Sequence, residues 1–99
     1  KNPETALVKK QQGYYNYLHG LMVSQTNLNQ AEKFFRKAIE LGLSMDMDLA
    51  VAKLNLAGIA MSRRRKIEAT TLLNETIKLD KQKMLKDQIT MMKQQLKKI

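Results

Sequence analysis

Four consecutive positive charges in the segment SRRRKIEA, residues 62–69, are the strongest chemical signal in the sequence. They are Arg63, Arg64, Arg65 and Lys66. Such a run could bind the phosphates of a nucleic acid, because Arg and Lys release the counterions that surround the phosphate backbone. It could equally be a solvated turn between two helices, where charge costs little free energy. The eight residues alone leave both interpretations open.

Side chains able to carry catalysis or to bind a metal are scarce. The sequence has no Cys and a single histidine, His19, with no acid beside it. A general base needs an orienting partner and a metal needs three or four ligands, so we expect His19 to be a partly buried or interhelical packing residue. Asp46 and Asp48 are sufficiently explained as acids at the start of a helix. We therefore predict no catalytic residue, no metal site and no cofactor, and expect a non-enzymatic protein.

The net charge of +9 is unevenly distributed along the chain. Residues 1–50 carry 6 basic and 5 acidic groups, whereas residues 51–99 carry 12 and 4. Any preference for an acidic peptide, a nucleic acid or an anionic membrane surface therefore belongs to the second half, although a Lys-rich surface can also serve solubility alone.

The sequence contains neither a signal-peptide pattern nor an apolar run near the roughly 20 residues that span a bilayer. We favour a cytoplasmic location. Because the chain begins with Lys1 rather than Met, a soluble domain of a longer or membrane-anchored protein is the alternative.

The elements that position these side chains are predicted to be helices throughout. Only one Pro and four Gly occur, and helix-forming residues dominate. The expected helices cover about residues 3–25, 29–41, 46–62 and 66–79, and a fifth reaches nearly to the end. Asn2 is expected to cap the first, Asn29 with Glu32 the second, and Asp80 the fifth. The predicted inward-facing residues of the fourth helix are Ile67, Leu72, Leu73 and Ile77.

A helical hairpin is repeated after 38 residues. Between residues 15–41 and 53–79 the identical pairs are Leu18/Leu56, Gly20/Gly58, Ser24/Ser62, Ala31/Ala69, Ile39/Ile77 and Leu41/Leu79. Such internal repetition is typical of a solenoid, in which successive hairpins stack. Each repeated glycine costs a helix about 1 kcal/mol relative to Ala, so we expect close approach of another chain segment at Gly20 and Gly58.

The repeat resembles the tetratricopeptide repeat (TPR) family. The matching residues are Tyr15, Leu18, Ala31, Phe35 and Ala38 in the first unit, and Leu56, Ala57, Ala69 and Leu73 in the second. The resemblance implies an all-α superhelix of about five antiparallel helices forming one domain, 1–99. Repeat one covers about residues 12–43, repeat two about 50–81 and a capping helix about 82–98. The spacing exceeds the family's usual length of about 34, and neither unit ends in Pro.

In that family the first helix of each unit lines a groove that binds a peptide or a partner protein. The residues that the resemblance places in this groove are Asn16, Gly20, Val23, Leu54, Gly58 and Met61. A protein-interaction module, with an acidic partner as one option, is therefore the leading functional hypothesis.

Two alternatives use other parts of the chain. Aligning the repeats places residues 62–67, which contain the basic run, opposite residues 24–29, within the turn of a hairpin. This position favours a solvated turn over a nucleic-acid-binding patch. The last helix carries apolar residues in heptad spacing, which could cap the array or pair with a second copy of the chain. These residues are Leu85, Ile89, Met92, Leu96 and Ile99.

Overall fold

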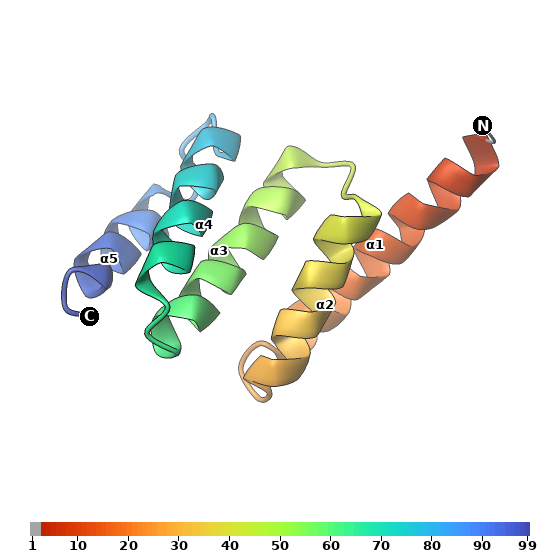
Figure 1. Cartoon of the computed structure of the whole chain (residues 1–99). Coiled ribbons are helices and arrows are strands. Elements are labelled where there is room, and N and C mark those ends of the chain that lie inside the picture. The colour runs from red at the N-terminus through yellow and green to blue at the C-terminus, as the bar shows by residue number, and fades with distance from the viewer. Residues whose placement is uncertain (1–2) are drawn as a thin grey trace.

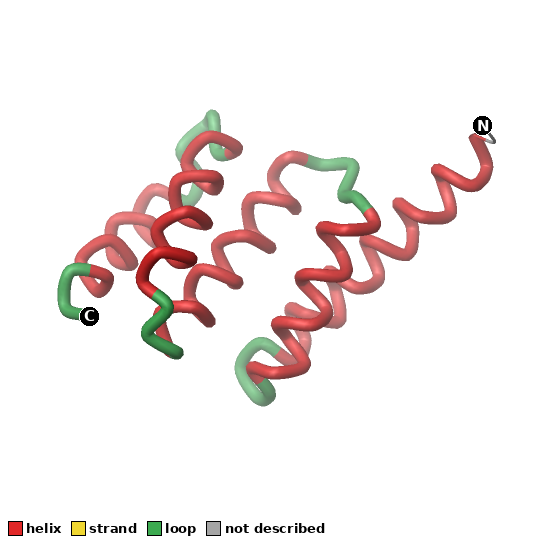
Figure 2. Tube along the Cα trace, in the orientation of Figure 1, coloured by secondary structure: helices red, strands yellow, loops and turns green. Residues whose placement is uncertain are grey.

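The computed structural model describes residues 3–99, with side chains from residue 5, and this part of the chain is entirely helical. The helices are α1 (Pro3–Val23), α2 (Leu28–Leu41), α3 (Asp46–Ser62), α4 (Lys66–Leu79) and α5 (Lys86–Leu96). Figure 2 shows helices joined by short turns, with no strand between residues 3 and 99. The predicted all-α class is confirmed. The expected cap Asn2 lies outside the described residues.

The helices form two hairpins and a final helix (Figure 1). α1 packs along α2, and α3 packs along α4, as the two most extensive helix pairs. α2 joins the first hairpin to α3, while α5 contacts both α4 and α3. The stack is elongated, with principal extents of 47 × 30 × 21 Å. In Figure 1 the first turns of α1 extend beyond the end of α2.

The two hairpins repeat in their geometry as well as in their sequence. α4 begins and ends 38 residues after α2, since 66 − 28 and 79 − 41 both equal 38. The buried residues also correspond: Ala31, Phe35 and Ala38 in α2 match Ala69, Leu73 and Thr76 in α4. Equivalent positions of the two hairpins therefore contribute to the core.

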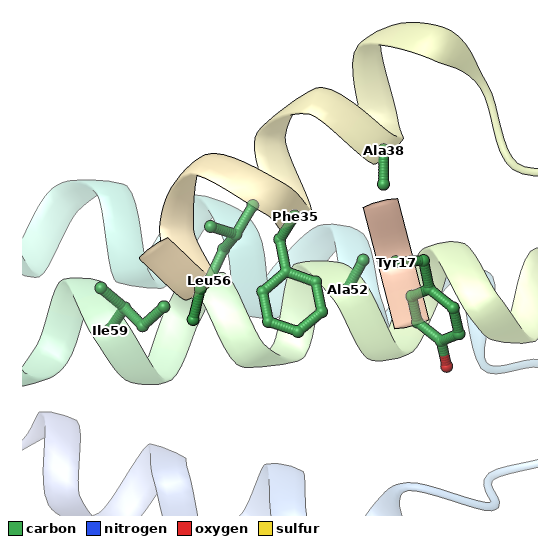
Figure 3. Close-up of a cluster of buried hydrophobic side chains, with 7 residues drawn as sticks. Tyr17, Phe35, Ala38, Ala52, Leu56 and Ile59 are labelled. Atoms are coloured by element: carbon green, nitrogen blue, oxygen red, sulfur yellow. The ribbon is translucent and has the colours of Figure 1, made fainter. Parts of the chain in front are cut away.

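The largest core cluster joins α1, α2 and α3 (Figure 3). Phe35 is fully buried, and its ring lies edge-on to that of Tyr17, with centroids 6.4 Å apart. Ala38 and Ala52, both fully buried, present only a methyl group to the cluster. Small residues let paired helix axes come within about 8–10 Å of each other.

Tyr17 occupies the buried aromatic position that the sequence assigned to Tyr15. Tyr15 is 63% exposed, whereas Tyr17 is only 7% exposed. Burial, the negative charge of Asp48 and the neighbouring Tyr14 raise the pKa of Tyr17 to about 12. The phenol therefore stays protonated near neutral pH and contributes packing rather than acid–base chemistry.

The expectation that Ile67 faces inward is wrong, because this side chain is 85% exposed. Its counterpart in the first hairpin is Asn29, which is also exposed. Both positions follow directly after the first residue of their helix and point away from the partner helix. Ile77 is likewise exposed, while Leu72 is half-buried and Leu73 buried.

Two helix starts differ from the predicted ones. α2 is capped by Asn27, whose side chain accepts a hydrogen bond from the Gln30 N–H at 3.1 Å, and not by Asn29. α5 begins at Lys86 rather than near residue 82. Asp80 does not cap it directly; its carboxylate accepts the N–H groups of Met84 and Leu85 at 2.9 and 2.7 Å. Asp80 thus fixes the loop that leads into α5.

Candidate functional site

The basic segment is the turn between α3 and α4, and two of its arginines reach the first hairpin. Arg63 donates hydrogen bonds to Glu32 and to Asn29, both in the first turns of α2. The side chain of Arg65 lies 3.5 Å from a Glu32 oxygen. Asn29 and Glu32, which the sequence suggested as a capping box, therefore contact the second hairpin instead.

Glu32 is the centre of a group of charges that we name the Glu32 cluster: Glu32, Arg36, Arg63, Arg65 and Glu68. Arg36 bridges both acids, at 2.8 Å from Glu32 and 3.2 Å from Glu68. Partial burial would raise the pKa of Glu32, but hydrogen bonds from Arg36 and Arg63, together with their charges, outweigh it and hold the pKa below its usual value. The Glu32 carboxylate is thus stabilised in its charged form by the folded chain.

A pH dependence follows from the lowered pKa of Glu32. The unfolded chain binds a proton at the Glu32 carboxyl more readily than the folded chain does. The contribution of Glu32 to the free energy of unfolding is therefore complete above the ordinary pKa of 4.5. It is lost as the pH falls from 4.5 through the lowered pKa of the folded chain. We expect Glu32→Gln to reduce the free energy of unfolding by about 1 kcal/mol at neutral pH. Urea denaturation between neutral and acid pH should show that this difference shrinks below that pKa.

Glu40→Gln is the matched control for this experiment. Glu40 is far more exposed and meets only Lys37, at 3.7 Å. Its substitution should leave the acid dependence of the wild type almost unchanged. An acid dependence in Glu32→Gln identical to that of the wild type would contradict the assigned role of the cluster.

The candidate basic patch is divided between structural contacts and solvent. Arg63 and Arg65 belong to the Glu32 cluster, although Arg65 is exposed, whereas Arg64 and Lys66 are exposed and lie outside the cluster. Arg64 has φ 58°, the left-handed conformation that glycine adopts most easily. The backbone of the turn is therefore strained at Arg64, where glycine would be favourable. Because Arg63 and Arg65 contact carboxylates of the chain, only part of the positive charge of the turn is available to a ligand.

An apolar groove of about 330 Å³ crosses the surface of α3, and we name it the α3–α5 groove. Its floor comes from α3, one wall from α5 and the other from the α1–α2 turn and the start of α2. The lining residues are Ser24, Leu28, Leu54, Asn55, Gly58, Ile59, Gln88, Met91 and Met92. A neighbouring recess of about 370 Å³ shares Gly58 and Met92 and adds Met61, Ser62, Gln95 and Ile99.

Three of the six predicted groove residues lie in these two hollows, namely Leu54, Gly58 and Met61. The other three, all on α1, have different surroundings. Gly20 is covered by the ring of Phe35, and Val23 packs against the core. The amide of Asn16 donates to the carbonyl oxygen of Gln12 at 2.8 Å. The residue directly after α1, Ser24, does line the groove.

The methionine wall of the groove was not predicted from the sequence. Met91 is 57% exposed, and Met92 approaches Gly58, where an added Cβ would lie 3.6 Å from its methyl carbon. The abundance of methionine in the sequence suggested only that Met61, Met91 or Met92 could belong to an adaptable contact surface. Their contribution depends on where α5 docks, which no local pattern specifies.

α5 turns its heptad seam toward the chain's own helices. Ile89 is buried, and the other four seam residues, Leu85, Met92, Leu96 and Ile99, are half-buried. α5 packs on α4 and α3, so the seam covers apolar surface that the second hairpin would otherwise expose.

His19 is exposed and lies between helices, with its ring centroid 5.2 Å from that of Phe34 in α2. Among the side chains described, from residue 5 to residue 99, no three of His, Cys, Asp or Glu gather in a way that could hold a metal ion. None of the helices described for the chain combines the length and apolarity needed to cross a bilayer.

Comparison with protein-family models, with curated proteins and with solved structures gave no match.

Proposed function

We propose that the chain is a non-enzymatic protein-interaction module of the tetratricopeptide type, which binds a peptide segment of a partner protein in the α3–α5 groove. The observation that carries the proposal is the groove itself, an open and mostly apolar surface on α3 that Leu54, Met91 and Met92 line. Contiguous exposed apolar surface on a small domain commonly marks an interaction site. Flexible methionines such as Met91 and Met92 suit such a surface, because their side chains adapt to different partners.

The groove fits what the family resemblance implies for the second hairpin only, because the expected residues of α1 do not line it. Its floor is α3, the first helix of the second hairpin, and α5 follows as the next helix on the same side. Binding at this position leaves the hairpin cores intact, since Leu54 and Met61 are half-buried rather than core residues.

A charge placed on the groove floor tests the proposal. Leu54→Glu and Met61→Glu should each reduce partner binding at least tenfold, because an unpaired carboxylate in an apolar contact costs more than about 1.4 kcal/mol. The measurement is quantitative affinity capture of the partner from a lysate, followed by titration of the purified partner, with helicity and unfolding midpoint checked for each variant.

Ile67→Glu is the matched control, since it introduces the same charge at an exposed isoleucine on α4, outside the groove. It should bind like the wild type. Equal binding by all three folded variants would refute the groove as the binding site.

A nucleic-acid-binding function finds less support. Arg63 and Arg65 already contact carboxylates of the chain, so the basic turn offers fewer free cations than its sequence suggests.

A further inference from the structure

A second groove, between α4 and α5, has a different character from the α3–α5 groove. It encloses about 260 Å³ and has an apolar floor of Ile77 and Ile89. Lys83, Lys86 and Lys93 line it together with Thr90 and Asp80. We name it the α4–α5 groove. Lys86, Thr90 and Lys93 follow one face of α5, the face away from Gln88 and Met91 in the first groove, as expected for a period of 3.6 residues.

The three lysines of this groove are exposed, and none of them forms an ion pair with a described carboxylate. In the part of the chain whose side chains are described, no carboxylate lies within 4 Å of Lys83, Lys86 or Lys93. Asp80 is only 4% exposed, and its two oxygens accept backbone N–H groups of the adjoining loop. Three lysines and one aspartate give the lining a net charge of +2. The arginines of the Glu32 cluster, by contrast, are paired with carboxylates.

We propose that the α4–α5 groove binds an acidic peptide segment, with one apolar side chain of that segment over Ile77 and Ile89 and its carboxylates on the lysines. Lys86 and Lys93 lie two turns apart, about 10 Å along α5. An extended segment of three or four residues covers that distance at about 3.3 Å per residue. Acidic residues on both sides of one apolar residue therefore match the lining.

The lining favours a peptide over two other polyanions. No aromatic side chain and no arginine line the groove, so nothing there can stack on the bases of a single-stranded nucleic acid. The floor residue Ile89 is 7% exposed and recessed, which keeps it from inserting into a flat lipid surface.

The experiment uses the full chain and two dye-labelled octapeptides, EELEELEE and its neutral counterpart QQLQQLQQ, with binding followed by fluorescence anisotropy. The wild type should bind only the acidic peptide, and affinity should fall as salt rises from about 0.1 to about 1 M, where the screening length shrinks to about 3 Å. The triple variant Lys83→Gln, Lys86→Gln, Lys93→Gln should bind about tenfold more weakly.

A control variant with the same loss of charge, Lys9→Gln, Lys33→Gln, Arg64→Gln, separates the groove from general attraction, because all three of these residues are exposed and outside it. It should retain nearly wild-type affinity. Equal weakening in both variants, or equal affinity for the two peptides, would overturn the proposal. So would tighter, lysine-dependent binding of oligothymidylate or of phosphatidylserine vesicles.

Discussion

Replacing Phe35 by alanine is expected to lower the free energy of unfolding by about 3–5 kcal/mol. Small domains have only about 5–15 kcal/mol in total, so this single change should leave the chain marginally folded. The reason lies in the position of the ring. It is fully buried, meets Tyr17 from α1, and belongs to the cluster that includes Leu56 of α3. Its loss would open a cavity where two hairpins meet. Urea denaturation followed by circular dichroism measures the effect.

Phe34→Ala is the matched control for this prediction. Phe34 is adjacent in sequence and identical in type, but its side chain is half-buried and its aromatic neighbour is the exposed His19. We expect a loss of about 1 kcal/mol, because less apolar area leaves water at this position. Equal losses for the two variants would mean that the cluster around Phe35 does not hold the hairpins together.

Much of the fold could be predicted because the same local signals occur twice. The 38-residue repeat correctly paired the buried positions of α2 with those of α4, and the predicted limits of α3 and α4 agree with the structure. The prediction for Ile67 was wrong because it relied on the apolar residue type and did not use the repeat. Ile67 aligns with the polar Asn29, and that alignment already indicated a solvent-facing position.

Capping residues were harder to assign because several polar residues compete near each helix start. Asn27 and Asn29 are equally suitable caps by type, and only the direction of the chain decides between them. Asn29 and Glu32 are instead used by Arg63, a residue 31 positions beyond Glu32. A contact of this kind depends on how the hairpins stack, so neither segment reveals it alone.

Only the residues that α3 contributes to the candidate groove could be predicted from the sequence. Leu54, Gly58 and Met61 lie on one face of a single helix, and helical spacing is enough to group them. The predicted residues of α1 do not line the groove. Gly20, for example, lies against the ring of Phe35 in α2. The methionines of α5 and the lysines of the α4–α5 groove required the position of α5, which follows from its packing on α4 and α3.

Gly13→Ala is expected to lower the free energy of unfolding by at least about 2 kcal/mol, although alanine is the better helix former by about 1 kcal/mol. A Cβ at Gly13 would overlap the carbonyl oxygen of Gly42 and lie 3.2 Å from that of Ala38. Both obstacles are backbone atoms at the end of α2, so no side-chain rotation relieves the overlap. α1 and α2 therefore approach each other closely at Gly13.

For Gly58→Ala, in the second hairpin, we expect the opposite effect on the free energy of unfolding. An added Cβ would meet only the flexible Met92 side chain, at 3.6 Å, which is an ordinary contact. The close approach expected at Gly58 from its repetition is therefore wrong, whereas it holds at Gly20. Helix propensity should therefore dominate, and the free energy of unfolding should rise by up to about 1 kcal/mol. Denaturant titration of both variants separates packing from propensity. A loss of stability at Gly58, or none at Gly13, would contradict the helix contacts described for the two hairpins, since each prediction depends only on what lies next to the missing Cβ.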